Sequence, residues 1–157
     1  MTTSEQGSVK VTRVFGFPRE SVFRMWTDPK KLAEWWGPKE CVVVHSEIDP
    51  RPGGTMKVDQ RFPDGDTRLM TAIFDQVKPP ELLVFRVTSP GEAGFSPWEA
   101  LHTVTFEELG PRRTRLTAMT SVTAGPQGER ESLRGAYRAG WGESLDKLQR
   151  ALDRALQ

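Results

Sequence analysis

The residue with the clearest potential for chemistry in this sequence is His102. It lies in a segment in which every second side chain is apolar or aromatic, so its imidazole should point inward from a strand. An inward imidazole could orient a ligand or act as an acid or base. A core histidine that bonds a neighbouring backbone group or hydroxyl gives the same pattern, and the sequence favours this simpler interpretation. The residues that share the face of His102 are Trp98, Ala100, Val104 and Phe106.

Gln60 and the tryptophans are the other candidates for a binding site. Gln60 falls on the apolar face of a strand, where its amide needs a partner, either a ligand oxygen or a buried water. Indole rings supply broad apolar walls and one N–H donor each, which suits a ligand that contains rings. They are equally common in cores, which is the role that we expect of Trp26. The full set is Trp26, Trp35, Trp36, Trp98 and Trp141.

The sequence lacks the recognised motifs for phosphate, nucleophile and metal chemistry. Arg51-Pro52-Gly53-Gly54 has neither the Lys-Ser/Thr ending nor the following helix of a phosphate-binding loop, so it indicates a turn. Neither a Gly-x-Gly-x-x-Gly fingerprint nor a Gly-x-Ser-x-Gly elbow is present. Cys41, His45 and His102 do not have metal-ligand spacing, and Cys41 has no evident base. We therefore predict no catalytic residue, no metal and no cofactor.

The bulk properties indicate one globular domain. The 157 residues match the length of a single domain that can bury its own core. Lys plus Arg number 22 against 21 acidic residues, which argues against nucleic acid or a membrane surface as partner. The chain has no apolar stretch near the ~20 residues of a membrane span, no signal-like start and one cysteine. We predict a cytoplasmic, reduced protein with a disordered lead-in at 1–7 and one domain at 8–157.

The first part of the chain predicts one strand and two short helices. β-branched and aromatic residues over 9–17 indicate the strand. A helix follows Pro18, and Asp28-Pro29 is typical of the start of a second one, with Asp28 as N-cap. The second helix should carry Trp35 and Trp36 and end at Gly37-Pro38, with at most one of these two indoles in the deep interior.

From residue 39 to about 123 the apolar period is two, which indicates antiparallel strands joined by short links. A two-residue Asp64-Gly65 turn would place Leu69, Thr71 and Ile73 on the face of Phe62. The Pro79-Pro80 turn instead favours Ala72 and Phe74 beside Phe85. We predict a β-bulge between residues 67 and 76 that reconciles the two turns. The strands are expected at 41–48, 56–62, 67–77, 82–87, 98–106 and 114–122.

A long helix is predicted from about Glu129 nearly to the end of the chain. Its apolar stripe must lie on the sheet, because no other partner is large enough to bury it. A straight helix against a curled sheet leaves space at one end, which is a natural ligand pocket. The fold is therefore α+β: a six- to seven-stranded antiparallel sheet wrapped around a long C-terminal helix. The stripe consists of Leu133, Tyr137, Trp141, Leu145, Leu148, Leu152 and Leu156.

The predicted ligand site combines the inward faces of the strands with the stripe of the helix. The loop from Ser89 to Trp98, which contains two prolines and two glycines, could form a lip over the cavity or simply connect two strands. The predicted ligand-binding residues are Met56, Gln60, Phe74, Phe85, Trp98, His102, Tyr137 and Trp141.

Several segments occur in the order found in a known family: Thr12-Arg13-Val14-Phe15, Asp28-Pro29 with Trp35-Trp36-Gly37-Pro38, Arg51-Pro52-Gly53-Gly54, Pro79-Pro80-Glu81, and Gly140-Trp141 with Ser144, Leu145 and Leu148. Over roughly residues 9–156 the chain resembles the bacterial single-domain members of the Aha-type family, named for activators of the heat-shock protein 90 ATPase. The resemblance implies the helix-grip fold of the START-like, birch-pollen-allergen-like superfamily. That fold serves lipid carriers, hormone receptors, polyketide cyclases and co-chaperone domains alike.

Three functions stay open at this point. The first is a protein that holds an apolar, lipid-like or aromatic small molecule in the cavity. The second is an enzyme such as a cyclase or hydrolase that uses the same cavity, although only His102 is placed inward among the titratable groups. The third and least favoured is a stress-response co-chaperone, because the chain has no room for the additional N-terminal domain of the eukaryotic activators. An exposed edge strand would also allow a homodimer.

Overall fold

The computed structural model describes residues 8–92 and 94–155, so the predicted lead-in at 1–7 and the stripe residue Leu156 lie outside it. The chain begins with β1 (Ser8–Phe15), followed by α2 (Arg19–Thr27) and α3 (Pro29–Leu32). Asp28 caps α3 as predicted, because its carboxylate accepts the backbone N–H groups of Lys30 and Lys31 at 2.9 and 3.3 Å. The helix ends at Leu32 rather than at Gly37, and turns carry the chain on through the two tryptophans.

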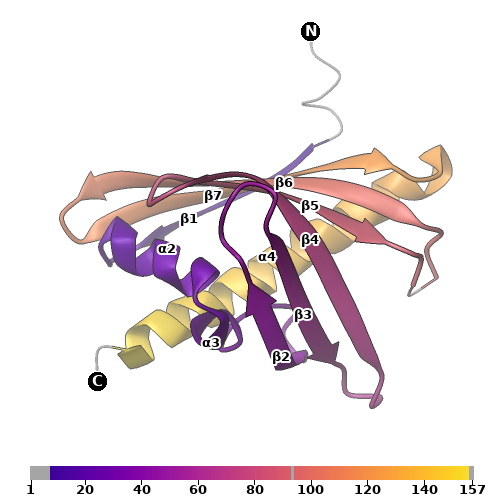
Figure 1. Ribbon diagram of the computed structural model, residues 1–157, viewed down its shortest axis with the longest axis horizontal. Helices are drawn as coiled ribbons and strands as arrows, with labels where there is room; N and C mark the ends of the chain where they lie inside the picture. The colour runs from indigo at the N-terminus through magenta and orange to yellow at the C-terminus, as the bar shows by residue number, and fades with distance from the viewer. Residues whose placement is uncertain (1–7, 93, 156–157) are drawn as a thin grey trace, which may run out of the picture.

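The remaining strands join β1 in one seven-stranded antiparallel sheet with the order β1-β7-β6-β5-β4-β3-β2 (Figure 1). Each of β2 to β7 therefore pairs with its neighbour in sequence, and β1 pairs with the last strand. The fold class predicted from the sequence is confirmed, with the larger of the two predicted strand numbers. The strands are β2 (Val42–Ile48), β3 (Thr55–Arg61), β4 (Thr67–Lys78), β5 (Leu82–Ser89), β6 (Trp98–Gly110) and β7 (Arg113–Ala124).

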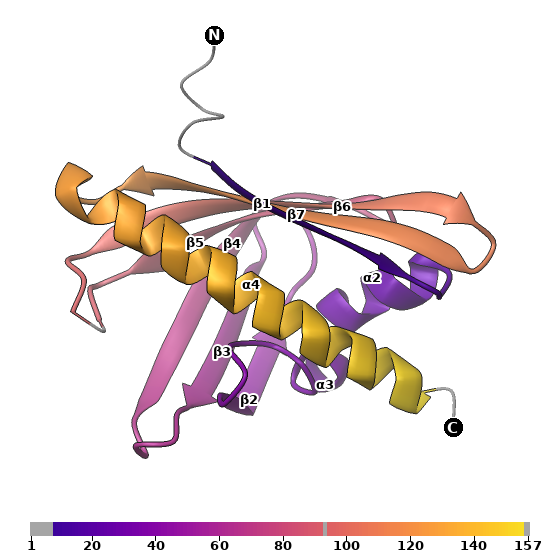
Figure 2. The same ribbon diagram turned by 180° about the vertical axis from the view of Figure 1, so that it is seen from behind.

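The long helix α4 (Gln127–Ala155) crosses one face of the sheet diagonally (Figures 1 and 2). Its backbone runs close to β1 and β7, while the end of the sheet formed by β2, β3 and β4 bends away from the plane of β6 and β7. The helix thus closes over one side of the concave face and stands off from the other. Its buried apolar residues are Leu133, Trp141, Leu145, Leu148, Ala151 and Leu152.

Aromatic rings fill the space between the short helices and α4. Trp26 lies between Trp35, with ring centroids 4.6 Å apart, and Trp141, with centroids 5.6 Å apart. Trp35 is fully buried and donates its indole N–H to the Met25 carbonyl at 2.9 Å. Trp36 is only partly buried, so the adjacent indoles do point in different directions, as the sequence predicts.

The hairpin between β3 and β4 is longer than predicted. Arg61 pairs with Thr67, because Gly65 takes a left-handed conformation (φ 87°) and donates its N–H to the Phe62 carbonyl at 2.9 Å. The register is therefore shifted by one residue from that of a two-residue turn. A shift of one residue exchanges the two faces of a strand.

The prediction that Leu69, Thr71 and Ile73 face inward is consequently wrong. Leu69 and Ile73 are 54% and 49% exposed, whereas Ala72 and Phe74 are buried at 1%. The bulge within 67–76 is confirmed, since the pairing of β4 with β5 slips between Phe74 and Gln76. Before the bulge, the even-numbered residues of β4 point inward. After it the odd-numbered Val77 does so, and it pairs with the buried Leu83.

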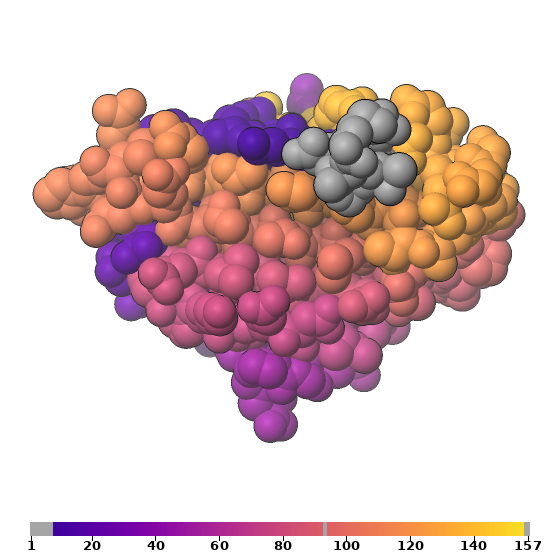
Figure 3. Space-filling view, turned by 90° about the horizontal axis from the view of Figure 1, so that it is seen from above, coloured from indigo at the N-terminus to yellow at the C-terminus, as the bar shows by residue number. Residues whose placement is uncertain are grey.

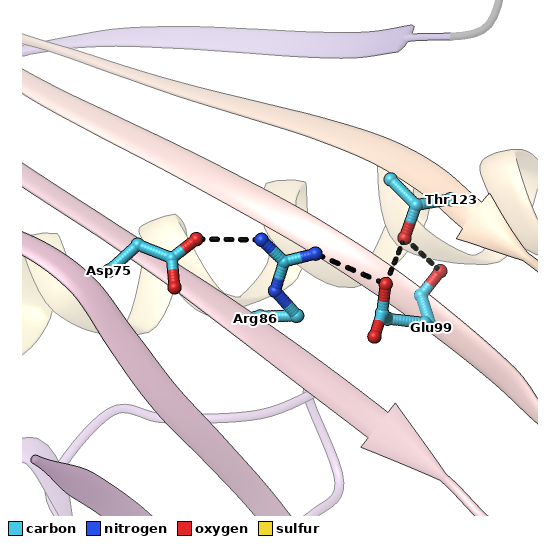
Figure 4. A network of polar contacts seen from close by, with 4 residues as sticks. All are labelled: Asp75, Arg86, Glu99 and Thr123. Atoms are coloured by element: carbon cyan, nitrogen blue, oxygen red, sulfur yellow. Dashed lines mark hydrogen bonds and ion pairs between the residues drawn. The ribbon is translucent and has the colours of Figure 1, made fainter. Parts of the chain in front are cut away.

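The outer face of the sheet carries a polar network that joins four strands (Figure 4). Arg86 of β5 donates to Asp75 of β4 at 2.8 Å and to Glu99 of β6 at 3.2 Å. Thr123 of β7 donates its hydroxyl to the same Glu99 carboxylate at 2.7 Å. Figure 3 looks onto this face, on which residues of β4 to β7 form the surface. This network ties the strands together on the side that α4 does not cover.

Candidate functional site

A cavity of about 270 Å³ lies between α4 and the part of the sheet that bends away from it. The sheet contributes residues of β3, β4, β5 and β6, and α4 contributes a line of residues one helical turn apart. Three loops complete the wall: one after α3, the hairpin between β3 and β4, and one between β5 and β6. The side chains contributed by α4 are Leu133, Ala136, Tyr137, Trp141 and Ser144, with Gly140 between them.

Five of the eight residues predicted to bind a ligand line this cavity: Gln60, Trp98, His102, Tyr137 and Trp141. The other three, Met56, Phe74 and Phe85, are buried in the core beneath it, each at most 2% exposed. Phe85 does not reach the cavity because Trp36 and His102 pack against it, with ring centroids 6.3 and 5.0 Å away. The role of the five in binding stays a prediction.

His102 is buried and held by one hydroxyl. Its Nδ1 lies 2.8 Å from Thr120 Oγ1, which also accepts the indole N–H of Trp141 at 2.8 Å. The Thr120 hydroxyl accepts the indole N–H, so its own proton is available to Nδ1, and in that tautomer Nε2 carries the ring proton. Burial lowers the pKa of His102 to about 3, so the imidazole is neutral at neutral pH. The simpler interpretation of His102, a core histidine bonded to a hydroxyl, describes one side of the ring, and the other side faces the cavity.

Tyr137 places a second hydroxyl at the cavity. Its oxygen accepts the indole N–H of Trp98 at 3.0 Å, and its ring stands edge-on to His102 with centroids 5.1 Å apart. Burial raises the pKa of Tyr137, the nearby Glu92 carboxylate adds to the rise, and the bond from Trp98 opposes it. The phenol therefore stays protonated, and its O–H has no acceptor in the part of the chain that the structure describes. His102 and Tyr137 both line the cavity, and each can donate a hydrogen bond to a molecule inside it.

The loop after α3 is fixed to α4 by a partly buried lysine. Lys147 Nζ donates to the carbonyls of Trp36, Gly37, Pro38 and Cys41 at 3.1 to 3.3 Å. Burial lowers its pKa, because desolvation disfavours the charged form.

Ser144 adds a further bond, from its hydroxyl to the Gly37 carbonyl at 2.8 Å. These contacts hold Trp36, Gly37 and Pro38 as one wall of the cavity. No motif indicated this wall, since the bonds run from side chains of α4 to backbone carbonyls, which every residue possesses.

The loop between β5 and β6 borders the cavity on the opposite side. Glu92 and Phe95 line it, and Phe95 packs edge-on against Trp98 with centroids 5.8 Å apart. Glu129 at the start of α4 accepts the backbone N–H and the hydroxyl of Ser96, both at 2.8 Å. The loop is therefore attached to the helix, in the position that the sequence predicted for a lip.

Arg68 also lines the cavity, and it was not among the predicted ligand-binding residues. Of the residues missed in this way, it matters most for chemistry because it carries a charge. It lies on β4 directly opposite Gln60, and its guanidinium carbon is 4.2 Å from the centre of the Phe62 ring. The predicted register placed Arg68 on the outer face. The signal that could have placed it inward is the run Met70, Ala72, Phe74, which keeps the same parity and matches the apolar face of β5.

The geometry gives no support for a metal centre, because no group of three or more His, Cys, Asp or Glu residues within 8–92 and 94–155 could hold an ion. Across the same ranges, no helix has the length and apolar character needed to cross a bilayer. The arrangement can bind an apolar molecule and offer it hydrogen-bond donors.

Comparison with known proteins agrees with the fold. Residues 16–153 match the model of a family described as Activator of Hsp90 ATPase homolog 1-like protein. Among curated proteins, none matches the chain significantly.

Solved structures of bacterial proteins share the fold along almost the whole chain. A protein of Arthrobacter aurescens superposes with a TM-score of 0.79 at 24% identity, over 98% of this chain and 90% of its own. An AHSA1 protein of Silicibacter pomeroyi gives a TM-score of 0.78 at 22% identity, over 94% and 99%. A protein of Nitrosomonas europaea gives 0.77 at 22% identity, over 94% and 95%. At these identities the likeness extends to the fold alone.

Proposed function

The chain belongs to the Activator of Hsp90 ATPase homolog 1-like family, and we propose that this member binds an apolar small molecule in the cavity under α4. The observation that carries the proposal is the cavity itself, about 270 Å³ in volume and walled largely by aromatic and aliphatic side chains. Apolar cavities of ~150 Å³ bind benzene, and ordinary ligand pockets begin near ~300 Å³. A ligand with one or two rings, or a short acyl chain, therefore fits.

A few polar groups would set the orientation of such a ligand. The Tyr137 hydroxyl can donate a hydrogen, as can His102 in the tautomer with its proton on Nε2, and neither has an acceptor among the residues that are described. Few polar groups in an otherwise apolar lining are typical of ligand sites. A carbonyl or hydroxyl oxygen on the ligand would satisfy both donors.

Neither of the other two functions is favoured by a specific observation. Catalysis usually requires two or more convergent titratable groups, but His102 bonds a hydroxyl and no carboxylate, and burial keeps its pKa low. The activation of a chaperone ATPase, which the family description mentions, would use a protein-binding surface rather than a closed cavity. A pull-down with the bacterial chaperone and an ATPase assay would test that function separately.

Two glycines of α4 allow a direct test of the cavity. Gly140 lines it, Gly135 does not, and a β-carbon added to either meets no atom within 4 Å. Leucine at either position should be tolerated, since it favours the helix over glycine by up to ~1 kcal/mol. Gly140→Leu fills the cavity, whereas Gly135→Leu serves as the matched control.

Binding is measured by isothermal titration calorimetry and saturation-transfer NMR with 2-acetylnaphthalene, a neutral two-ring ketone. We expect the wild type and Gly135→Leu to bind it with the same affinity, and Gly140→Leu to lose at least tenfold. Equal affinity in both variants would place the ligand elsewhere, and absence of binding by the wild type to this ketone and to one-ring and acyl-chain analogues would overturn the proposal.

A further inference from the structure

Arg68 is unusual among the arginines of this protein because it is partly buried and faces the cavity. Within the described residues it has no hydrogen bond and no carboxylate within ion-pair distance, and its contact is the Phe62 ring. The other described arginines that lack both kinds of partner are exposed on the surface, where water solvates the guanidinium. They are Arg24, Arg61, Arg112, Arg113, Arg138 and Arg150.

No acceptor bonds Arg68 among the described residues, and an amide donor lies on the neighbouring strand. Gln60 lies directly opposite on β3, so the two side chains are neighbours on the cavity face. Its amide oxygen is occupied by the Cys41 thiol at 3.6 Å, and its NH₂ group has no partner in the described part of the chain. A fork of guanidinium donors and an amide NH₂ therefore point to the same end of the cavity.

One carboxylate, that of Glu92, also lines the cavity. Glu92 belongs to the loop between β5 and β6, beside Tyr137, whose pKa it helps to raise after the larger effect of burial. It forms no ion pair with Arg68. Arg68 therefore lines the cavity without a counter-ion among the described residues.

We infer that the ligand is an apolar monocarboxylic acid, whose carboxylate binds Arg68 and Gln60 and whose ring or chain lies against Trp36 and Trp141. This inference rests on the proposed function and specifies its ligand class. A planar guanidinium matches the two oxygens of a carboxylate, and the bond is strengthened because the site is partly shielded from water. The Phe62 ring beneath the guanidinium holds its plane and leaves its edge free for the ligand.

The test compares two ligands of the same shape and different charge. Naphthalene-2-carboxylate and 2-acetylnaphthalene have the same rings and the same number of non-hydrogen atoms, so they differ in the charge of one group. Calorimetry gives the affinity of both for the wild type, Arg68→Gln and Arg86→Gln. The last variant removes an arginine from the outer face and controls for net charge.

We expect the wild type to bind the carboxylate about 10- to 100-fold more tightly than the ketone, in keeping with a charge-assisted hydrogen bond. Arg68→Gln should remove this preference and leave the affinity for the ketone unchanged, and Arg86→Gln should alter neither. The preference should also shrink at 1 M salt.

Different outcomes distinguish a failure of the acid inference from a failure of the proposed binding function. Equal binding of acid and ketone by the wild type, or an equal loss of both in Arg68→Gln, overturns the acid inference while the binding function stands. Absence of binding for both ligands and for the one-ring and acyl-chain analogues overturns both levels. The Gly140→Leu variant confirms that the signal comes from the cavity, since it should lose the carboxylate as well as the ketone.

Discussion

Arginines on the two faces of the sheet differ in their partners. On the outer face, Arg86 donates to carboxylates of two neighbouring strands, and Asp75 first and then Glu99 raise its pKa above the usual value (Figure 4). On the inner face, Arg68 of the neighbouring strand lies over the Phe62 ring and has no hydrogen bond or ion pair among the described residues. The sheet positions both side chains equally well, so the difference lies in what surrounds them.

This difference distinguishes side chains that stabilise the fold from side chains that are open to a ligand. The outer network consists of groups that satisfy one another, and it needs nothing from outside the chain. The inner face combines close packing in its core with donors at the cavity that have no acceptor. A few polar groups in an otherwise apolar lining are typical of ligand sites. Variants that act on one face at a time can test this division.

The largest expected effect is a loss of stability, and it is tested by truncating two adjacent residues of β4. Phe74 points inward and is 1% exposed, whereas Ile73 points outward and is 49% exposed. Phe74→Ala should lower the free energy of unfolding by about 3–5 kcal/mol, because it removes a buried ring and leaves a cavity. Ile73→Ala should change it by about 0.5 kcal/mol. Urea unfolding followed by tryptophan fluorescence measures both, and similar losses would contradict the assignment of the two faces.

A smaller effect, dependent on pH, is expected for His102. Its pKa in the folded protein is lowered to about 3 from an ordinary value of 6.5, so between these values the unfolded chain binds more protons. Stability should therefore fall as the pH drops below 6.5, by at most ~1.4 kcal/mol per pH unit from this residue, and should be independent of it above 6.5.

The measurement compares unfolding free energies of the wild type and His102→Gln between pH 4 and 8. The advantage of the wild type over the variant should shrink as the pH falls. His45→Gln, which removes the exposed imidazole on β2, is the control and gives the background. Parallel curves for the wild type and His102→Gln would show that the pKa of His102 is the same in the folded and the unfolded chain.

The sequence predicts the parts of this fold that depend on periodicity. Alternation over β6 placed His102 inward, and helical spacing placed Trp141 on the buried stripe of α4. The error in β4 came from a loop length: one additional residue in the Asp64-Gly65 turn reversed the two faces, and Arg68 was assigned to the wrong one.

The cavity walls were harder to predict than the strands. The wall at Trp36 and Gly37 depends on bonds from Lys147 to backbone carbonyls, which leave no pattern in the sequence. Met56, Phe74 and Phe85 were predicted correctly as inward, but alternation cannot separate a core position from a cavity position. That distinction depends on which neighbouring rings cover a side chain.

The smallest effect on stability is expected from two threonines of β7, of which one lies on the inner face and one on the outer face. Thr120 is fully buried, and its hydroxyl joins Trp141 to His102, whereas Thr123 is exposed and donates to Glu99. Thr120→Val keeps the shape of the side chain but leaves a buried indole N–H and an imidazole nitrogen without their partner, which should cost about 1–3 kcal/mol. Thr123→Val should stay within about 0.5 kcal/mol, because water replaces the lost bond.

The same pair of variants also reports on the cavity. Without the hydroxyl of Thr120, the proton on His102 is free to move to Nδ1, so the donor at Nε2 is no longer fixed. Thr120→Val should therefore weaken binding of 2-acetylnaphthalene severalfold, and ¹⁵N chemical shifts of the imidazole should show the change of tautomer. Thr123→Val should alter neither the affinity nor these shifts. An unchanged tautomer in Thr120→Val would mean that packing alone, without the hydroxyl, orients the ring of His102.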